Sequence, residues 1–204
     1  GECLEDDPRA EDPDTLAEII EGLPKVSRQV DRCRSITHRL LNFARKSEAK
    51  VEVANVNAAM DEILPFLVKE ARLLNISIHK EYDQGLPRVR MEEMQLQEVF
   101  INLISNAIQA MGHRGEGNIW LSTAVEEGKV KIVVRDDGPG IAKPVLERLF
   151  DPFVTTKAPG QGTGLGLSIC YGIVRRYEGA ITVQSREGVG TTFEVVLKVD
   201  REAK

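Results

Sequence analysis

The sequence has few cysteines, no excess of basic residues and no long apolar run. Its three cysteines, Cys3, Cys33 and Cys170, lie too far apart for a metal-binding spacing or a disulfide framework, which favours a reducing cytosol. The net charge of -5 argues against a nucleic-acid-binding surface. No apolar stretch approaches the roughly 18 residues that a membrane-spanning helix needs. The acidic, polar start does not resemble a signal peptide.

The composition is that of a globular protein, with 42% hydrophobic and 29% charged residues, enough for one large or two small domains with a core. Residues 1–13 are acidic and contain prolines, so we predict a loop. In residues 14–48 apolar side chains recur at intervals of three and four, which predicts a long helix that Pro24 kinks or splits. An apolar stripe of this length needs a partner, so we expect one strand of a coiled coil or of a helical hairpin, buried by a second copy of the chain or by an upstream helix. Because the chain begins with Gly1 and not with Met, we interpret it as part of a longer protein.

Residues 51–199 alternate between strand and helix patterns, and residues 200–204 are a tail. We predict strands at 51–56, 75–82, 118–127, 129–137, 179–186 and 190–198, and helices at 58–74, 92–111 and from about 162 to 177. Some of these strands follow one another across short turns, as in hairpins, whereas others are separated by a helix. The combination predicts an α+β fold with a mixed sheet that carries its helices on one face.

Two polar side chains interrupt the apolar helix pattern EVFINLISNAIQAM at 98–111. Asn102 and Asn106 are four residues apart, and Glu98 lies four residues earlier, so the three share one helical face. A carboxamide inside a core needs a hydrogen-bond partner. Either neighbouring backbone groups satisfy these amides, or their oxygens hold Mg²⁺, which prefers oxygen ligands and takes few from the protein when phosphates and water supply the rest.

A glycine-rich segment, GQGTGLGLS at 160–168, places glycines at alternate positions before an apolar helix. This arrangement suits close backbone approach and phosphate binding at a helix start, but it also suits a flexible hinge. It fits neither the dinucleotide-binding fingerprint nor the Walker loop.

We predict a long loop from Gly138 to about Gly162, and two further segments lie at its start and inside it. VRDDGPGI, at 134–141, ends a strand with two aspartates, which predicts either an ordinary turn or a carboxylate that accepts a hydrogen bond from a ligand amine. RLFDPFVTTK, at 148–157, sets Phe150 and Phe153 in the middle of the loop, which indicates a lid that packs part of the time.

Taken in order, these four segments resemble the N box, the first glycine box, the F box and the second glycine box of sensor histidine kinases in two-component systems. Their catalytic domain belongs to the superfamily of gyrase, chaperone, histidine kinase and mismatch-repair ATPases. The resemblance implies the Bergerat fold, a two-layer α/β sandwich, over about residues 51–199. GTTFEVVL, from residue 190, resembles the closing strand of the family. Residues 27–46 resemble the second helix of the dimerisation and phosphotransfer hairpin.

The resemblance implies ATP and Mg²⁺ as cofactors and gives roles to single residues. Asp136 would accept a hydrogen bond from the adenine amino group, Asn106 would bind Mg²⁺, and Asn102 would face the phosphates. The other residues that it implies for the nucleotide site are Gly138, Gly140, Ile141, Gly162, Thr163, Gly164, Leu165, Gly166 and Thr192, the last near the adenine and its bound water.

The amide at position 102 also bears on the type of reaction. In the hydrolytic relatives a glutamate at this place activates water, whereas an amide cannot act as a general base, and Glu98 lies one turn further away. The residues therefore favour transfer of the ATP γ-phosphoryl group to another group over hydrolysis. The resemblance implies a histidine nitrogen as the acceptor, and such a transfer depends on positioning and on charge neutralisation.

The expected acceptor sequence, a histidine followed by an acidic residue and a proline, is missing. Of His38, His79 and His113, only His38 lies on the predicted long helix, and arginine and leucine follow it. We therefore expect the acceptor on a helix upstream of Gly1, and we predict that this chain binds ATP without labelling itself. The resemblance further implies a homodimer, a response-regulator receiver domain as partner, and a cytoplasmic location, with membrane anchoring of the parent protein left open.

Three other interpretations remain open at this point. The first is an ATPase or ATP-gated clamp of the same superfamily, which steady ATP turnover would favour. The second is a serine kinase of the anti-sigma type, which would make an acid-stable product. The third is a dimerisation module with a decayed nucleotide site, which would bind no nucleotide.

Overall fold

The computed structural model describes residues 53–112, 114–157 and 162–200. The predicted loop at 1–13, the long helix at 14–48 and most of the tail therefore lie outside the described residues, and the proposed domain boundaries stay a prediction. None of the helices in the described ranges combines the length and the apolar character that crossing a membrane requires.

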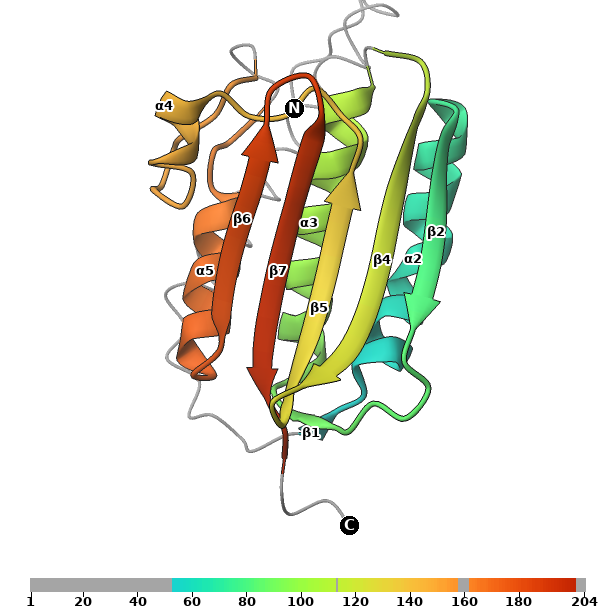
Figure 1. The fold of residues 1–204 in the computed structure, drawn as a ribbon, viewed down its shortest axis with the longest axis vertical. Helices are drawn as coiled ribbons and strands as arrows, with labels where there is room; N and C mark the ends of the chain where they lie inside the picture. Colours follow the sequence, from blue (N-terminus) through green and yellow to red (C-terminus); the bar gives the residue numbers. More distant parts are fainter. Residues whose placement is uncertain (1–52, 113, 158–161, 201–204) are drawn as a thin grey trace, which may run out of the picture. The chain divides into compact units, whose positions relative to one another are not determined.

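The described chain forms a five-stranded sheet and a two-stranded sheet together with four helices. In chain order the elements are β1 (Val53–Ala54), α2 (Val56–Leu73), β2 (Ile76–Tyr82), β3 (Val89–Arg90), α3 (Glu93–Met111), β4 (Gly117–Glu126), β5 (Lys129–Asp136), α4 (Lys143–Leu146), α5 (Gly166–Arg176), β6 (Ala180–Arg186) and β7 (Gly190–Lys198). The large sheet has the strand order β2-β4-β5-β7-β6, and β1 pairs with β3. Helices α2, α3 and α5 cover one face of the large sheet (Figure 1). This arrangement confirms the predicted two-layer fold.

The pairing of the strands makes the sheet mixed, as predicted. Strand β2 pairs with β4 in parallel, because β3 and the crossover helix α3 lie between them in the chain, while the other pairs in this sheet are antiparallel. The hairpin between β4 and β5 turns at Glu127 and Gly128, with φ of 51° and 70°. Two successive residues at positive φ are the geometry of a two-residue hairpin turn that matches the twist of the strands.

The core lies between the sheet and its helices. On β5, Val130, Ile132, Val134 and Asp136 alternate toward the helices and are buried. Helix α3 turns a continuous apolar face to them, including the fully buried Phe100. Because a strand alternates with period two, every second residue of β5 is fixed on the helix side, and the carboxylate that ends the strand is carried there as well.

Helix α2 begins two residues before the predicted start and runs through Pro65 without ending. The side chain of Asn55 accepts a hydrogen bond from the backbone amide of Ala58 at 3.1 Å and caps the helix. Pro65 removes one backbone donor, but its apolar neighbours Ile63 and Leu67 are buried on either side, so packing holds the helix together across the proline.

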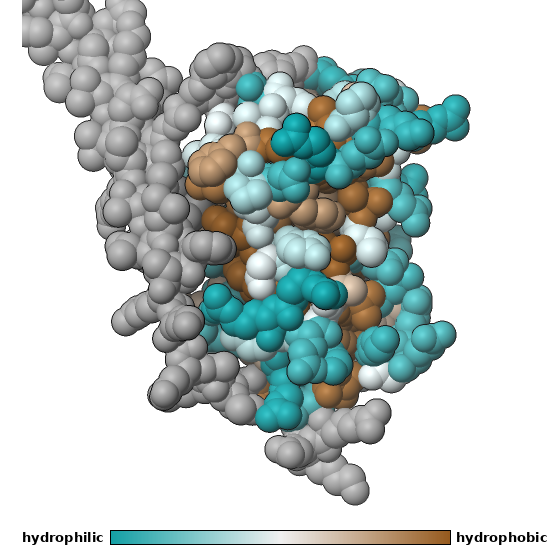
Figure 2. Space-filling model, turned by 90° about the vertical axis from the view of Figure 1, so that its left-hand side faces the viewer, coloured by the Kyte–Doolittle hydropathy of each residue, from teal (hydrophilic) through white to brown (hydrophobic). Residues whose placement is uncertain are grey.

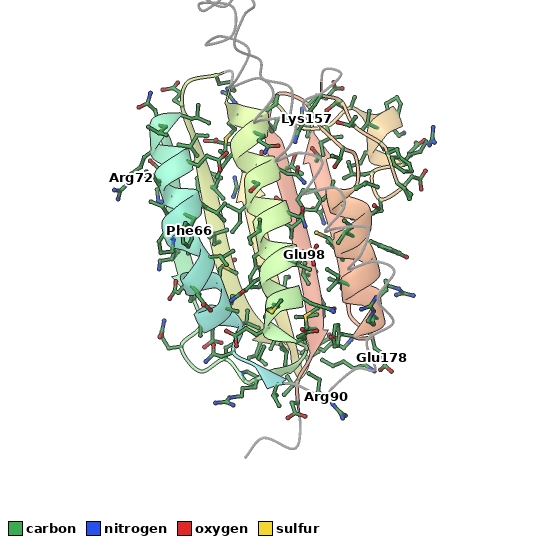
Figure 3. All side chains as sticks on the ribbon, turned by 180° about the vertical axis from the view of Figure 1, so that it is seen from behind. Phe66, Arg72, Arg90, Glu98, Lys157 and Glu178 are labelled. Atoms are coloured by element: carbon green, nitrogen blue, oxygen red, sulfur yellow. The ribbon has the colours of Figure 1, made fainter. Side chains whose placement is uncertain are left out.

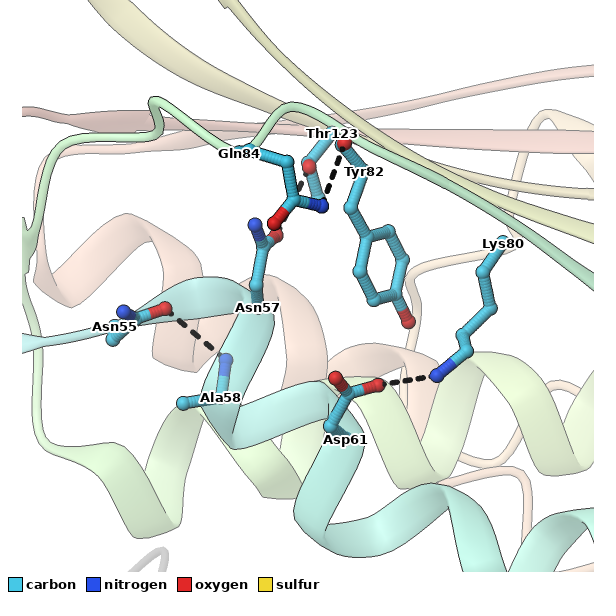
Figure 4. Close-up of polar contacts among 8 residues, drawn as sticks. All are labelled: Asn55, Asn57, Ala58, Asp61, Lys80, Tyr82, Gln84 and Thr123. Atoms are coloured by element: carbon cyan, nitrogen blue, oxygen red, sulfur yellow. Dashed lines mark hydrogen bonds and ion pairs between the residues drawn. The ribbon is translucent and has the colours of Figure 1, made fainter.

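A polar cluster fastens the beginning of α2 to the sheet (Figure 4). The hydroxyl of Thr123 donates to Asn57 Oδ1 at 3.0 Å, and Asn57 Nδ2 donates to the backbone carbonyl of Asp83 at 2.8 Å. Lys80 forms an ion pair with Asp61 at 2.7 Å. These contacts lie at the end of the sheet away from the end of β5, so they support the fold from the side opposite to the predicted nucleotide-binding residues.

The sequence did not predict two short elements. Strand β3 lies in the segment between β2 and α3, and it is held by pairing with β1. Helix α4 lies inside the predicted long loop. Neither element is long enough to show a hydrophobic period of its own.

Candidate active site

The predicted site residues gather at one end of the molecule, the upper end in Figure 1, where β5 ends, the β6–β7 hairpin turns and α5 begins. The carboxyl-terminal half of α3 reaches the same end. The four sequence segments are therefore brought together by the order of strands and helices, although they are spread over residues 98–168 of the chain.

Asp136 is the buried carboxylate of this end, with 5% of its surface exposed. Its Oδ1 accepts a hydrogen bond from the backbone amide of Gly138 at 2.9 Å. Burial raises the pKa of Asp136 above its ordinary value, although hydrogen bonds from the backbone amides of Gly138 and Thr191 oppose the rise. A desolvated carboxylate held by backbone amides is a strong acceptor for a donor group on a ligand.

The neighbouring Asp137 holds the end of β5 to β4. Its two oxygens accept hydrogen bonds from the backbone amide and the side-chain amide of Asn118, at 2.7 and 2.9 Å, and its carbonyl accepts one from Arg114 at 2.7 Å. Burial by itself would raise the pKa of Asp137, but the hydrogen bonds from Asn118 and the charge of Arg114 outweigh it and lower the pKa. Asp137 therefore fastens the end of β5 to β4, and Asp136 is left facing the site.

The first glycine box is braced by the β6–β7 hairpin. A Cβ atom at Gly140, whose φ is +71°, would lie 2.2 Å from the carbonyl oxygen of Arg186. The amide of Ile141 donates to Ser185 Oγ at 2.8 Å, and this hydroxyl also contacts Thr191 Oγ1 at 2.9 Å. A side chain at position 140 would push the loop off the hairpin, so glycine is required there.

The structure does not bring Thr192 to Asp136. In β7, Thr191 pairs with Asp136 and is buried on the helix side with Phe193, whereas Thr192 pairs with Arg135 and turns to the open face of the sheet. The alternation of the strand separates the two threonines. We therefore replace Thr192 by Thr191 in the proposed adenine pocket.

Asn102 lies against the beginning of α5. Its Nδ2 donates to the backbone carbonyl of Glu98 at 2.9 Å, so the helix backbone satisfies the donor half of the amide. Its Oδ1 would lie 2.8 Å from a Cβ atom at Gly166. Glycine at the first residue of α5 thus lets the two helices approach closely, and the amide oxygen of Asn102 is held at the amino-terminal end of α5.

Asn106 is held by a cation. Lys157 Nζ donates to Asn106 Oδ1 at 3.3 Å, and it also donates to Gln109 Oε1. Figure 3 shows Lys157 near the carboxyl-terminal end of α3, whereas Glu98 lies toward the other end of that helix. The amide oxygen of Asn106 is therefore turned toward a positive charge, which is the orientation that a metal ligand needs.

The F box and the second glycine box lie against each other. The backbone amide of Phe153 donates to the carbonyl of Gly164 at 2.9 Å, and a Cβ atom at Gly164, whose φ is +65°, would lie 2.4 Å from the carbonyl carbon of Phe153. Phe150 packs on the core, and its ring lies tilted against the ring of Tyr171 of α5 with the centroids 5.4 Å apart, while Phe153 is 72% exposed. Only part of the predicted lid is thus anchored by aromatic packing.

The residues that join the lid to α5 form a short polar turn. Thr163 Oγ1 accepts a hydrogen bond from the backbone amide of Leu165 at 3.4 Å, and a Cβ atom at Gly162 would lie 2.7 Å from Thr155 Oγ1. Their roles toward a nucleotide stay a prediction, but the turn places the beginning of α5 beside Asn102.

Comparisons with known proteins agree with this geometry. Residues 91–201 match the family described as histidine kinase-, DNA gyrase B- and HSP90-like ATPases. The chain is 34% identical over 180 residues to sporulation kinase E of Bacillus subtilis (strain 168), an alignment that covers 88% of this chain and 24% of that protein. It is also 34% identical over 176 residues to sensor histidine kinase ZraS of Escherichia coli (strain K12), covering 86% of this chain and 37% of the relative. The chain thus spans about a quarter to two fifths of these relatives.

Solved structures give the same result. The nucleotide-free catalytic domain of histidine kinase ThkA superimposes with a TM-score of 0.65 at 34% identity, over 75% of this chain and 98% of that one. ThkA in complex with the response regulator protein TrrA superimposes with a TM-score of 0.72 at 28% identity, over 95% of this chain and 54% of that chain. The chain therefore belongs to the histidine kinase-, DNA gyrase B- and HSP90-like ATPase family, and the relatives ZraS and ThkA are histidine kinases. The resemblance drawn from the four motifs is confirmed.

Sequence reasoning missed several residues of this end of the molecule. Each of them lies on a segment that only the folded chain brings to the site. Strand register places Thr191 and Ser185 there, and the pairing of β4 with β5 places Asn118. The contact between the F box and α3 places Lys157 and Gln109. The two threonines could have been separated by counting the alternation back from the buried Phe193, whereas the other contacts depend on tertiary pairing.

Proposed function

We propose that this chain is the ATP-binding, catalytic part of a sensor histidine kinase, which transfers the γ-phosphoryl group of ATP to a histidine outside the described residues. The observation that carries the proposal is that a buried carboxylate and an amide oxygen beside a cation lie at the same end of the fold. Asp136 is a buried acceptor for the adenine amino group, and Asn106 is an amide oxygen already turned toward a positive charge.

Mg²⁺ fits this site through Asn106. Among the described residues, histidine, cysteine, aspartate and glutamate do not gather in threes, so an all-protein metal cage is not available there. Mg²⁺ bound together with phosphates needs one or two protein ligands, and an amide oxygen is a suitable one. When bound, the ion would neutralise negative charge on the phosphate oxygens as the phosphoryl group is transferred.

The residues of this chain would act mainly by holding the nucleotide in place. Asp136 orients the base, and the amides at the beginning of α5 face the phosphate end, where the helix dipole favours negative charge. Asn102 cannot take a proton from water, and Glu98 lies toward the other end of α3. The site therefore favours positioning for transfer to a nucleophile brought by another segment over hydrolysis.

The edge of the domain beside α5 supports a helical partner. Figure 2 views this edge, where hydrophobic side chains show between polar ones over α5 and the segment around α4. Tyr171 and Phe153 are exposed there by 42% and 72%. A helix that carries the acceptor histidine could bury this surface and bring its imidazole to the phosphate end. Relay to the receiver domain of a response regulator, a homodimeric parent protein and a cytoplasmic location complete the proposal; the ThkA structure in complex with TrrA supports the choice of partner.

The test is a calorimetric titration of the chain with ATP and Mg²⁺, in which the same sample is assayed for released phosphate and for acid-labile protein phosphate. Binding with neither sustained turnover nor self-labelling is the expected result. Sustained turnover would favour an ATPase and make Glu98 the suspected base. Acid-stable phosphate on a serine of an added partner would favour the anti-sigma type of kinase. Absence of binding would contradict the proposal.

A further inference from the structure

A lysine of the lid occupies the place that the proposed function gives to the metal ion. Lys157 Nζ donates to the amide oxygens of Asn106 and Gln109, which lie three residues apart on one face of α3. Lys157 comes from the end of the F box, 51 residues further along the chain than Asn106. Its ammonium group thus ties the lid to the helix of the phosphate end.

This contact and metal binding exclude each other. Mg²⁺ binds its oxygen ligands at about 2.0–2.1 Å, and a second cation on the same oxygen would be repelled strongly at that distance. When Mg²⁺ takes Asn106 Oδ1, the ammonium group must leave it. Gln109 Oε1 lies next to Asn106 and remains an acceptor, so the lysine stays at the phosphate end of the site after the exchange.

A phosphate group is the expected new partner of the Lys157 ammonium group, because the two carry opposite charges. Lysine carries a compact charge on a flexible stem and binds phosphate as a point charge. In the proposed function the terminal phosphate of the nucleotide would lie beside the metal and the lid, whereas the base would lie at Asp136. At Gly162, a Cβ atom would lie 3.0 Å from Lys157 Cδ, so glycine keeps the space beside the lysine stem clear.

We propose that Lys157 is the specificity-determining residue by which this site distinguishes ATP from ADP. Its ammonium group contacts Asn106 Oδ1, the oxygen that would bind Mg²⁺. When ATP and Mg²⁺ bind, it would turn to the γ-phosphate, which ADP lacks. This inference rests on the proposed function, because it needs a site that binds ATP with Mg²⁺.

The experiment compares the affinities of ATP and ADP, each with Mg²⁺, for the unaltered chain and for Lys157→Met. The Met side chain keeps the apolar stem and removes the charge. A matched control is Lys143→Met, which removes one positive charge from an exposed position in the same long segment. We expect Lys157→Met to weaken ATP about tenfold or more while ADP changes by less than about threefold, as for the loss of one charge-assisted contact to the terminal phosphate. Lys143→Met should change neither affinity.

The outcomes separate the inference from the proposed function. If the unaltered chain binds neither nucleotide, the proposed function fails and this inference fails with it. If it binds both and Lys157→Met weakens them equally, or weakens neither, the proposed function stands and the role of Lys157 is refuted. Thermal melting of each variant without nucleotide shows that the fold is retained, so a selective loss of ATP affinity reports on the γ-phosphate contact alone.

Discussion

Replacing Asp136 by asparagine tests the base end of the site. The carboxylate accepts backbone hydrogen bonds on one side, and its remaining acceptor capacity would bind the adenine amino group. In Asp136→Asn the amide oxygen can keep the backbone partners, which turns the NH₂ group toward the adenine amine, so that two donors face each other. Loss of a hydrogen bond to a charged group costs about 1.5–3 kcal/mol, which corresponds to a roughly 10- to 150-fold weaker affinity for ATP. Competition titrations with a fluorescent nucleotide would measure the ATP affinities of the variant and of the unaltered chain.

For the same variant we also expect a change in the preference for ATP over GTP and a change in stability with pH. Because guanine presents an oxygen where adenine presents an amine, the new NH₂ group should reduce the preference for ATP over GTP. The pKa of Asp136 is raised in the folded state, so the stability that its neutral form contributes at low pH is lost as the pH rises through the folded-state pKa. At pH 7 the asparagine avoids this loss, and the Tm of Asp136→Asn should equal or exceed that of the unaltered chain. Unchanged ATP affinity, or a Tm of Asp136→Asn below that of the unaltered chain, would refute the reasoning.

Two other substitutions test the supports of the site. Gly164→Ala places a Cβ atom on a residue with φ +65°, 2.4 Å from the carbonyl carbon of Phe153. We expect it to lower the free energy of unfolding by more than about 1 kcal/mol and to weaken the affinity for ATP. The control Gly172→Ala lies in α5, where a Cβ atom meets nothing within 4 Å, and it should be neutral or stabilising in thermal melts. Asn118→Ala removes the side-chain hydrogen bond from Asn118 to the carboxylate of Asp137. The pKa of Asp137 is lowered in the folded state, so the stability that its carboxylate contributes is present above the unfolded-state pKa and is lost as the pH falls through the folded-state pKa. The variant should therefore be less stable by about 1 kcal/mol at neutral pH, and the difference should shrink below about pH 4 in denaturation curves measured across pH.

The sequence predicted the fold where its periodicity was strong. The strand alternation of 129–137 and the helical face of 92–111 are confirmed within one residue at most boundaries, because burial on one face fixes the register of both elements. The short β3 and α4 escaped prediction because two or four residues show no period. Strand β3 is held by pairing with β1, and α4 by the packing of Val145 and Leu146 against the core. Neither contact can be identified from a local window of the sequence.

The candidate site was partly predictable for the same reason. Asp136 ends a strand of clear alternation, so its side could be worked out in advance. The choice of Thr192 over Thr191 ignored that alternation, which places Thr192 with Arg135 on the open face. The lysine that reaches Asn106 could not be identified from its position 51 residues away, since only the folding of the lid onto α3 makes them neighbours.

The bracing of the first glycine box has a consequence for small-molecule ligands. Gly188 donates its amide to the carbonyl of Pro139 at 2.7 Å, and at Gly190 a Cβ atom would lie 2.1 Å from the carbonyl oxygen of Asp136, so the loop and the hairpin pack closely on each other. A flat heteroaromatic fragment with one amine donor would meet a wall that its own contacts hold in shape, and it would lose little free energy to ordering the protein. The phosphate end, by contrast, must first exchange the contacts of its lysine. Inhibitor discovery on this domain should therefore begin from fragments the size of adenine and grow toward the lid.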